Sequence, residues 1–195
     1  MQIIQDKTQL PITVLVRPRA GNFIYSDPEK ELILKEIEAF INAGAEGIVI
    51  GARLEDGTID IPFMRDCQKI NTTAVSIFHR AFDFVEDHSK ALDQIIELGF
   101  DRLLTSGKAV SSIDGIPILN ELIHQADGRI SIMPGGGITA DNISQLITAV
   151  PAKEIHLSAK KTVFSTQENA PFNIDHYMTD EVELTKMIHQ IKSQF

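Results

Sequence analysis

Short apolar runs alternate with stretches of helical spacing along the whole chain, and this alternation constrains the fold most. The runs begin roughly every 24–36 residues, a spacing typical of successive βα units in a parallel sheet. In the run at residues 130–134, apolar residues fill both faces, as expected for a parallel strand covered on both sides. The predicted strands are residues 12–17, 47–52, 74–80, 102–107, 130–134 and 154–159. The predicted helices are residues 27–43, 61–70, 87–98, 113–125, 139–150 and 180–192.

The number of units restricts the architecture. A closed (βα)₈ barrel takes eight units and about 250 residues, whereas this chain offers six. An open doubly wound sheet is the alternative, but its G-x-G-x-x-G fingerprint is absent. We therefore predict an α/β fold with one domain over residues 1–195, a TIM-type (βα) barrel that is incomplete. An incomplete barrel exposes two strand edges, so we expect a homo-oligomer that covers them, or marginal stability.

Composition excludes several classes of protein. The formal charge of −9 argues against a nucleic-acid partner and against binding to an anionic membrane. No apolar run approaches the ~20 residues of a membrane span, and a signal-peptide core is absent. The single cysteine, Cys67, excludes an intramolecular disulfide and any multi-cysteine metal site. We expect a cytoplasmic protein without a membrane partner. A small anionic ligand stays compatible, because a local arginine cluster can oppose the overall charge.

A glycine-rich stretch follows the fifth predicted strand. Pro134 ends this strand, Gly135, Gly136 and Gly137 follow it, and residues 139–142 open a helical pattern. Glycines let backbone N–H groups approach a ligand closely, and the start of a helix suits an anion. The next strand ends with His156 and Ser158, and two such neighbouring strand ends hold phosphate in (βα) barrels. The stretch predicts an anion site, with a plain tight turn as the alternative.

Polar side chains also gather where the other strands end. They are Arg17 and Arg19, then His79, Arg80 and Asp83, then Thr105 and Ser106. The carboxyl edge of a βα sheet is its functional edge, so these groups should converge there. Arginines in this place suggest a small anion gripped bidentately, and His79 could be a general acid or base with Asp83 as its partner. A structural histidine and ion pairing of Arg17 or Arg80 with acidic residues are the alternatives.

Five of these stretches resemble one known family. They are VRPRAGNFIYS (16–26), FHRAFD (78–83), LLTSG (103–107), MPGGGI (133–138) and IHLSA (155–159). Their order and spacing are similar to those of the CutC family, which is named for a proposed role in copper homeostasis. The resemblance implies a cytoplasmic (βα) barrel involved in copper homeostasis, with copper as the implied ligand.

The chain departs from this family at its start. Family members begin with two further strands that carry Glu-Val-Cys-Val-Asp and Ile-Glu-Leu-Cys type segments, and neither is present here. The cysteines invoked for copper therefore have no counterpart, and Ala20 and Asn22 replace a glycine and an acid of the family pattern. We expect an N-terminally truncated barrel. A misplaced start codon, a truncated gene and a genuine six-unit protein are the readings left open.

Two functions follow from these residues. The first is the family role, a copper homeostasis protein that binds or carries the metal. The second is a barrel enzyme acting on a small phosphorylated or carboxylated substrate, in which His79 transfers a proton.

Cys67 is predicted to be a packing thiol, and no metal site is assigned. Residues 162–179 are long for a loop, and we expect a lid or a subunit contact there.

Overall fold

We describe the chain from a computed structural model, which covers residues 1–163 and 176–194. Five parallel strands form one sheet in the order β1-β2-β3-β4-β5. These strands are β1 (Thr13–Leu15), β2 (Gly47–Ile50), β3 (Val75–Phe78), β4 (Arg102–Thr105) and β5 (Ser131–Pro134). The predicted α/β fold of successive βα units is confirmed.

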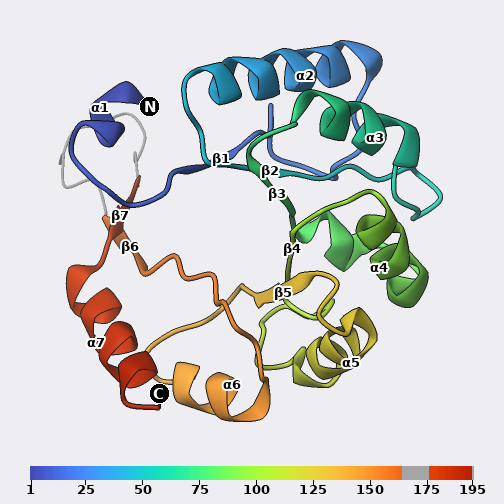
Figure 1. The fold of residues 1–195 in the computed structure, drawn as a ribbon. Helices are drawn as coiled ribbons and strands as arrows, with labels where there is room; N and C mark the ends of the chain where they lie inside the picture. Colours follow the sequence, from blue (N-terminus) through green and yellow to red (C-terminus); the bar gives the residue numbers. More distant parts are fainter. Residues whose placement is uncertain (164–175, 195) are drawn as a thin grey trace, which may run out of the picture.

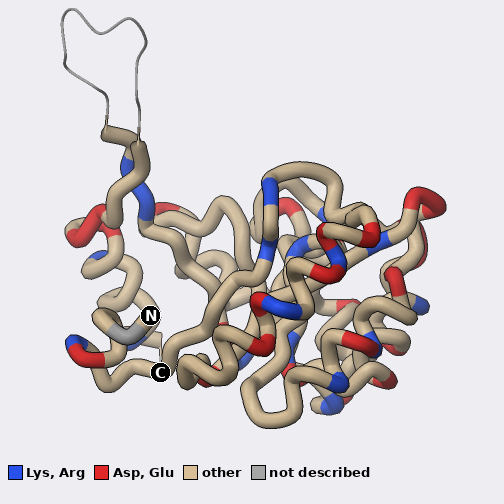
Figure 2. Tube along the Cα trace, turned by 90° about the horizontal axis from the view of Figure 1, so that it is seen from above, with Lys and Arg blue, Asp and Glu red and all other residues tan. Residues whose placement is uncertain are grey.

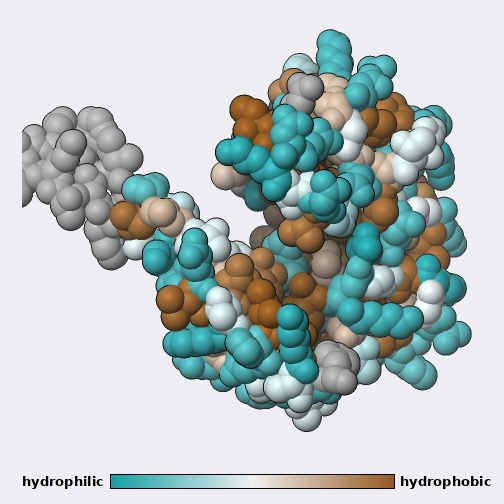
Figure 3. Space-filling view, turned by 60° about the vertical axis from the view of Figure 1, so that its left-hand side comes forward, coloured by the Kyte–Doolittle hydropathy of each residue, from teal (hydrophilic) through white to brown (hydrophobic). Residues whose placement is uncertain are grey.

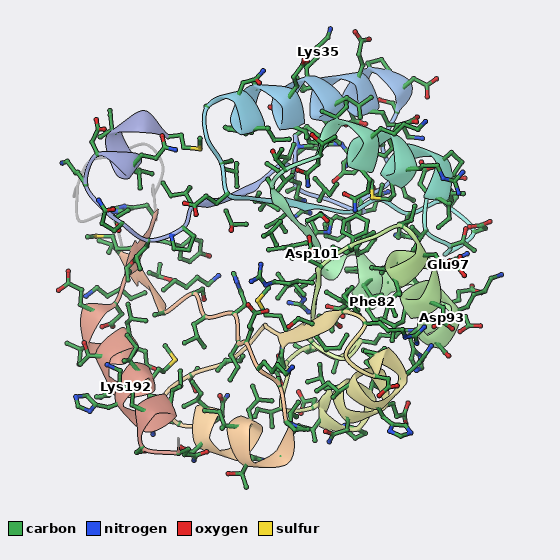
Figure 4. All side chains as sticks on the ribbon, in the orientation of Figure 1. Lys35, Phe82, Asp93, Glu97, Asp101 and Lys192 are labelled. Carbon is green, nitrogen blue, oxygen red and sulfur yellow. The ribbon has the colours of Figure 1, made fainter. Side chains whose placement is uncertain are left out.

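Helices surround the sheet on its outer side (Figure 1). They are α2 (Asp27–Asn42), α3 (Ile61–Ile70), α4 (His88–Glu97), α5 (Ile116–Ala126), α6 (Ile143–Ala149) and α7 (Glu181–Lys192), with a short α1 (Gln2–Gln5) at the start. Several begin with the caps that the sequence provides: the Asp87 carboxylate accepts a hydrogen bond from Lys90 N at 2.9 Å, and Ser26 and Glu29 form a capping box on α2. Charged side chains such as Lys35, Asp93 and Lys192 lie on the outer faces of these helices (Figure 4).

Alternation along the strands divides the apolar residues into two sets. Ile48, Ile50, Phe78 and Leu103 are almost fully buried in the core. Their strand neighbours point to the opposite face, where Val49, Ile77, Leu104 and Met133 line the hollow inside the curved sheet. The outer set packs against the helices, and the inner set shapes a cavity.

The prediction of a sixth strand at residues 154–159 is largely wrong. Residues 154–159 make a single parallel bridge, between Gly135 and His156, in which His156 N donates to Pro134 O at 2.9 Å. The ladder stops there because Gly136 and Gly137 take φ angles of +117° and +66°. These angles turn the backbone after β5 away from residues 157–159. The predicted neighbour of β5 is thus present as one contact point rather than a ladder.

The two ends of the segment predicted as a lid or a subunit contact, residues 162–179, lie in the paired strands of a β-hairpin. Strand β6 (Lys160–Val163) pairs antiparallel with β7 (His176–Thr179), and the part between them lies outside the described residues. The hairpin projects from the body (Figure 2), and basic and acidic residues are interspersed over the outer helices. Figure 1 shows the hairpin and α1 on the side where the two ends of the curved sheet would meet.

The other differences are local. Arg80 was predicted within a strand, but a 3-10 helix η1 (Arg80–Phe84) starts at this residue, because the His79 ring caps its first turn.

In the described part of the chain, no strand pairs with the outer edge of β1. No helix described here combines the length and apolar character needed to span a membrane.

Candidate functional site

A cavity of about 610 Å³ lies inside the curved sheet. Apolar side chains of all five strands line its walls, and polar groups lie at both strand ends. The polar and charged lining residues are Thr13, Arg17, Glu46, His79, Arg80, Arg102, Glu154 and His156. Figure 3 shows the hollow opening between two halves of the molecule, with apolar residues on its rim. Its size is that of a small-molecule site.

Arg80 is fixed at the carboxyl edge of the sheet by Asp83. Its Nε donates to Asp83 Oδ2 at 2.6 Å, and its Nη2 donates to Ser106 Oγ at 2.7 Å. The Asp83 side chain is only 5% exposed. It also accepts hydrogen bonds from Thr105 Oγ1, Ser106 N and Lys108 N. The guanidinium is therefore held rigidly while part of it faces the cavity.

These contacts assign roles to three predicted site residues. Thr105 and Ser106 are fully buried, and their hydroxyl groups are engaged with Asp83, Arg80 and Ala109 O. Ser106 holds Arg80 directly, and Thr105 holds it through Asp83. Asp83, expected as the partner of His79, instead orients Arg80.

His79 is buried at the end of β3, where it is 4% exposed. Its Nδ1 accepts a hydrogen bond from Ala81 N at 3.2 Å. Burial lowers the pKa of His79 to about 4, and the neighbouring Arg17 charge acts in the same direction. The ring is thus neutral at pH 7. Gly51 makes room for it, because a Cβ there would lie 2.5 Å from His79 Nδ1.

Arg17 reaches the cavity over an aromatic ring, and Arg19 does not reach it. The Arg17 guanidinium lies 4.3 Å from the centre of the Phe23 ring, and its Nη2 donates to Gly21 O at 2.9 Å. Arg19 forms an ion pair with Glu29 at the start of α2 and donates to Ile24 O. The expectation that Arg19 converges with the other strand-end groups therefore fails, because the chain bends after β1 instead of staying extended.

The glycine loop abuts Arg80. A Cβ on Gly136 would lie 2.8 Å from Arg80 Nη1, and one on Gly135 would lie 3.0 Å from His156 Cβ. Gly135 N donates to Thr105 O at 2.9 Å. In the part of the chain described here, the N–H groups of Gly136 and Gly137 donate to no protein acceptor.

The far side of the loop belongs to a different hollow. Gly137 and Ser158 line a cavity of about 370 Å³ together with Asp180 and Glu183. The start of the helix region is occupied by a carboxylate, because Ala140 N donates to Glu183 Oε1 at 2.6 Å. The structure therefore brings Arg17, His79, Arg80 and His156 together, with the Gly135–Gly136 turn beside them. Ser158 and Gly137 lie apart, in the hollow lined by Lys160, Asp180 and Glu183.

Sequence reasoning missed three residues that line the main cavity and a glycine beside His79. Phe23 and Gly51 shape the surroundings of His79, and Arg102 and Glu154 form an ion pair at the amino edge of the strands, with Nε 2.7 Å from Oε2. This pair holds the pKa of Glu154 below its usual range. Both residues begin a predicted strand, so their position at one edge could have been found from the sequence.

The residues that could bind copper do not fit a copper site. Among the described residues, no group of three His, Cys, Asp or Glu side chains could hold a metal ion. Cys67 is fully buried, and burial raises the pKa of its thiol to about 12. A thiolate, the form that Cu(I) prefers, is therefore strongly disfavoured in the folded chain.

Several known proteins are similar to this chain in sequence. The chain is 43% identical over 166 residues to a human copper homeostasis protein cutC homolog, and the alignment covers 83% of this chain and 59% of the human one. A CutC protein from Vibrio campbellii is 42% identical, with 83% of this chain and 66% of the relative covered. The chain thus spans less than two thirds of these relatives' lengths.

Solved structures agree with the fold. The CutC protein from Streptococcus agalactiae matches with a TM-score of 0.74 and 30% identity, over 80% of this chain and 75% of that one. An aldolase at 18% identity matches with a TM-score of 0.59, over 76% of this chain and 68% of its own, which supports the barrel-like fold alone. The model of the CutC family matches residues 1–161. By sequence and fold together, this chain belongs to the CutC family.

Proposed function

We propose that this chain binds a small organic anion at the carboxyl edge of its sheet, as a barrel enzyme for a phosphorylated or carboxylated substrate would. The observation that carries the proposal is the fixed guanidinium of Arg80, which faces a cavity and abuts the glycine loop at Gly136. An arginine whose geometry is set in advance binds phosphate or carboxylate at low entropic cost.

Further groups support the same ligand class. Arg17 and His156 line the cavity with Arg80, and the backbone of Gly136 lies next to the Arg80 guanidinium. Burial lowers the pKa of His156, so its imidazole is neutral at pH 7 and can donate or accept a hydrogen bond. The role first expected for His79, proton transfer, is less suitable, since its Nδ1 is already engaged.

Inorganic phosphate tests this site. We expect it to bind to the wild type and to bind Arg80→Lys about 10- to 100-fold more weakly, because lysine cannot keep both the contact to Asp83 and the contact to an anion. Isothermal titration calorimetry measures the affinity. The matched control is Arg65→Lys, a change of an exposed residue on α3, which should bind like the wild type. Equal affinities for all three proteins would contradict the proposal.

Copper binding, the function suggested by the names of the relatives, receives a separate prediction. We expect the folded chain to lose Cu(I) to a strong chelator, because Cys67 and the nearby thioether of Met64 are both fully buried and the thiol stays protonated. Competition titrations of the wild type and Cys67→Ser measure this. Uptake of one equivalent at nanomolar affinity, abolished in Cys67→Ser, would show that the metal reaches this thiol.

A further inference from the structure

His79 presents a buried hydrogen-bond donor for which the protein supplies no acceptor. Because Nδ1 accepts from Ala81 N, the single proton of the neutral ring is on Nε2. In the described part of the chain, Nε2 has no hydrogen-bond partner, and Arg17 Nε, buried in the same way, has none either. Both side chains line the main cavity. Buried donors are nearly always paired in proteins, so two unpaired ones beside one cavity indicate an outside acceptor.

The Phe23 ring packs against both of these side chains. Its ring centre is 4.8 Å from that of His79 and 4.3 Å from the Arg17 guanidinium carbon. Phe23 has a φ of +61°, in the left-handed region that bulky residues adopt only under constraint. Because Nε2 is buried, a ligand reaches it only after surrounding side chains shift, and Phe23 is the neighbour whose backbone carries this constraint.

The two kinds of donor in the cavity suit different oxygen atoms. The charged guanidinium of Arg80 suits an anionic group, whereas a neutral imidazole N–H suits an uncharged carbonyl oxygen, which it polarises without transferring a proton. In the described part of the chain no lysine lines the cavity, so a carbonyl compound there would be activated by hydrogen bonding rather than as a Schiff base.

We infer that His79 donates a hydrogen bond from Nε2 to a carbonyl oxygen of the ligand whose anionic group lies at Arg80. The ligand class is then a small phosphorylated or carboxylated aldehyde or ketone. This inference rests on the proposed function, because it takes the position of the anion from Arg80.

Two phosphate esters that differ in one group test the inference. In 2-oxopropyl phosphate a carbonyl replaces the central CH₂ of propyl phosphate, and the charge is unchanged. We expect the wild type to bind the carbonyl ester about tenfold more tightly. His79→Leu should bind both esters equally, with the affinity of the wild type for propyl phosphate. Calorimetry measures the affinities.

A spectroscopic readout on the wild type covers the case in which His79→Leu does not fold. Nitrogen-15 NMR of the histidine rings should show protonated Nε2 and unprotonated Nδ1 for His79, and the Nε2 signal should shift with 2-oxopropyl phosphate and stay in place with propyl phosphate. Equal affinities and an unmoved Nε2 signal would overturn the inference while leaving the anion site intact. If neither ester binds, or if Arg80→Lys binds both as the wild type does, the proposed function itself fails.

Discussion

Asp83→Asn is expected to lower the free energy of unfolding by about 3 kcal/mol, the low end of the cost of breaking a buried ion pair, because Asp83 is buried whereas Arg80 is partly exposed. The carboxylate is 5% exposed and lies 2.6 Å from Arg80 Nε. It also accepts from Thr105 Oγ1, Ser106 N and Lys108 N. An asparagine side chain keeps one acceptor oxygen but turns an NH₂ group toward donors. At least one buried donor is then left unpaired, and Arg80 loses its counter-charge.

Chemical denaturation of the wild type and the variant measures this loss. Asp66→Asn is the matched control, because Asp66 also forms an ion pair three residues away, with Lys69, but its side chain is 53% exposed. Exposed pairs of this kind contribute between zero and about 1 kcal/mol. The same change at Asp83 should weaken phosphate binding, since Arg80 is no longer held. A variant as stable as the Asp66→Asn control would mean that Asp83 is not the support of this edge.

The fold was largely predictable from the sequence. Local signals fix each helix, such as Asp87 before α4 and Pro28 in the first turn of α2, and apolar runs fix the strands. The exception is residues 154–159, whose pattern is that of a strand. Its pairing depends on the backbone of the neighbouring Gly136 and Gly137, and the conformation of glycine is not specified locally. The β6–β7 hairpin was missed because residues 160–163 and 176–179 are short, almost entirely exposed stretches, and neither forms an apolar run.

The location of the candidate site was predictable from the sequence, but the contacts that its residues make were not. The rule that strand ends meet at one edge identified Arg17, His79, Arg80 and His156, and all four line one cavity. The rule gives no information on which charges the protein pairs internally. Arg19 forms an ion pair with Glu29 because the chain bends between them. Such a pairing depends on the conformation of the loop, which the spacing of residues in the sequence does not determine.

The stability of the chain should depend on pH through His79. The pKa of this residue falls from 6.5 in the unfolded chain to about 4 in the folded one, chiefly through burial, with a further contribution from the charge of Arg17. Asp83 opposes the shift. Between these pH values the unfolded chain binds more protons than the folded one, so the free energy of unfolding falls as the pH is lowered. The full difference is about 3 kcal/mol, present above pH 6.5 and lost by about pH 4.

Urea denaturation at a series of pH values from 7.5 to 4 tests this dependence, with those limits set by the pKa values above. His79→Gln cannot titrate, so the wild type should lose about 3 kcal/mol more than this variant over the range. His156, whose pKa is also lowered by burial, contributes equally to both proteins and cancels in the comparison. Parallel pH profiles for the wild type and His79→Gln would show that the imidazole is solvated in the folded chain, and Nε2 would then have water as its partner.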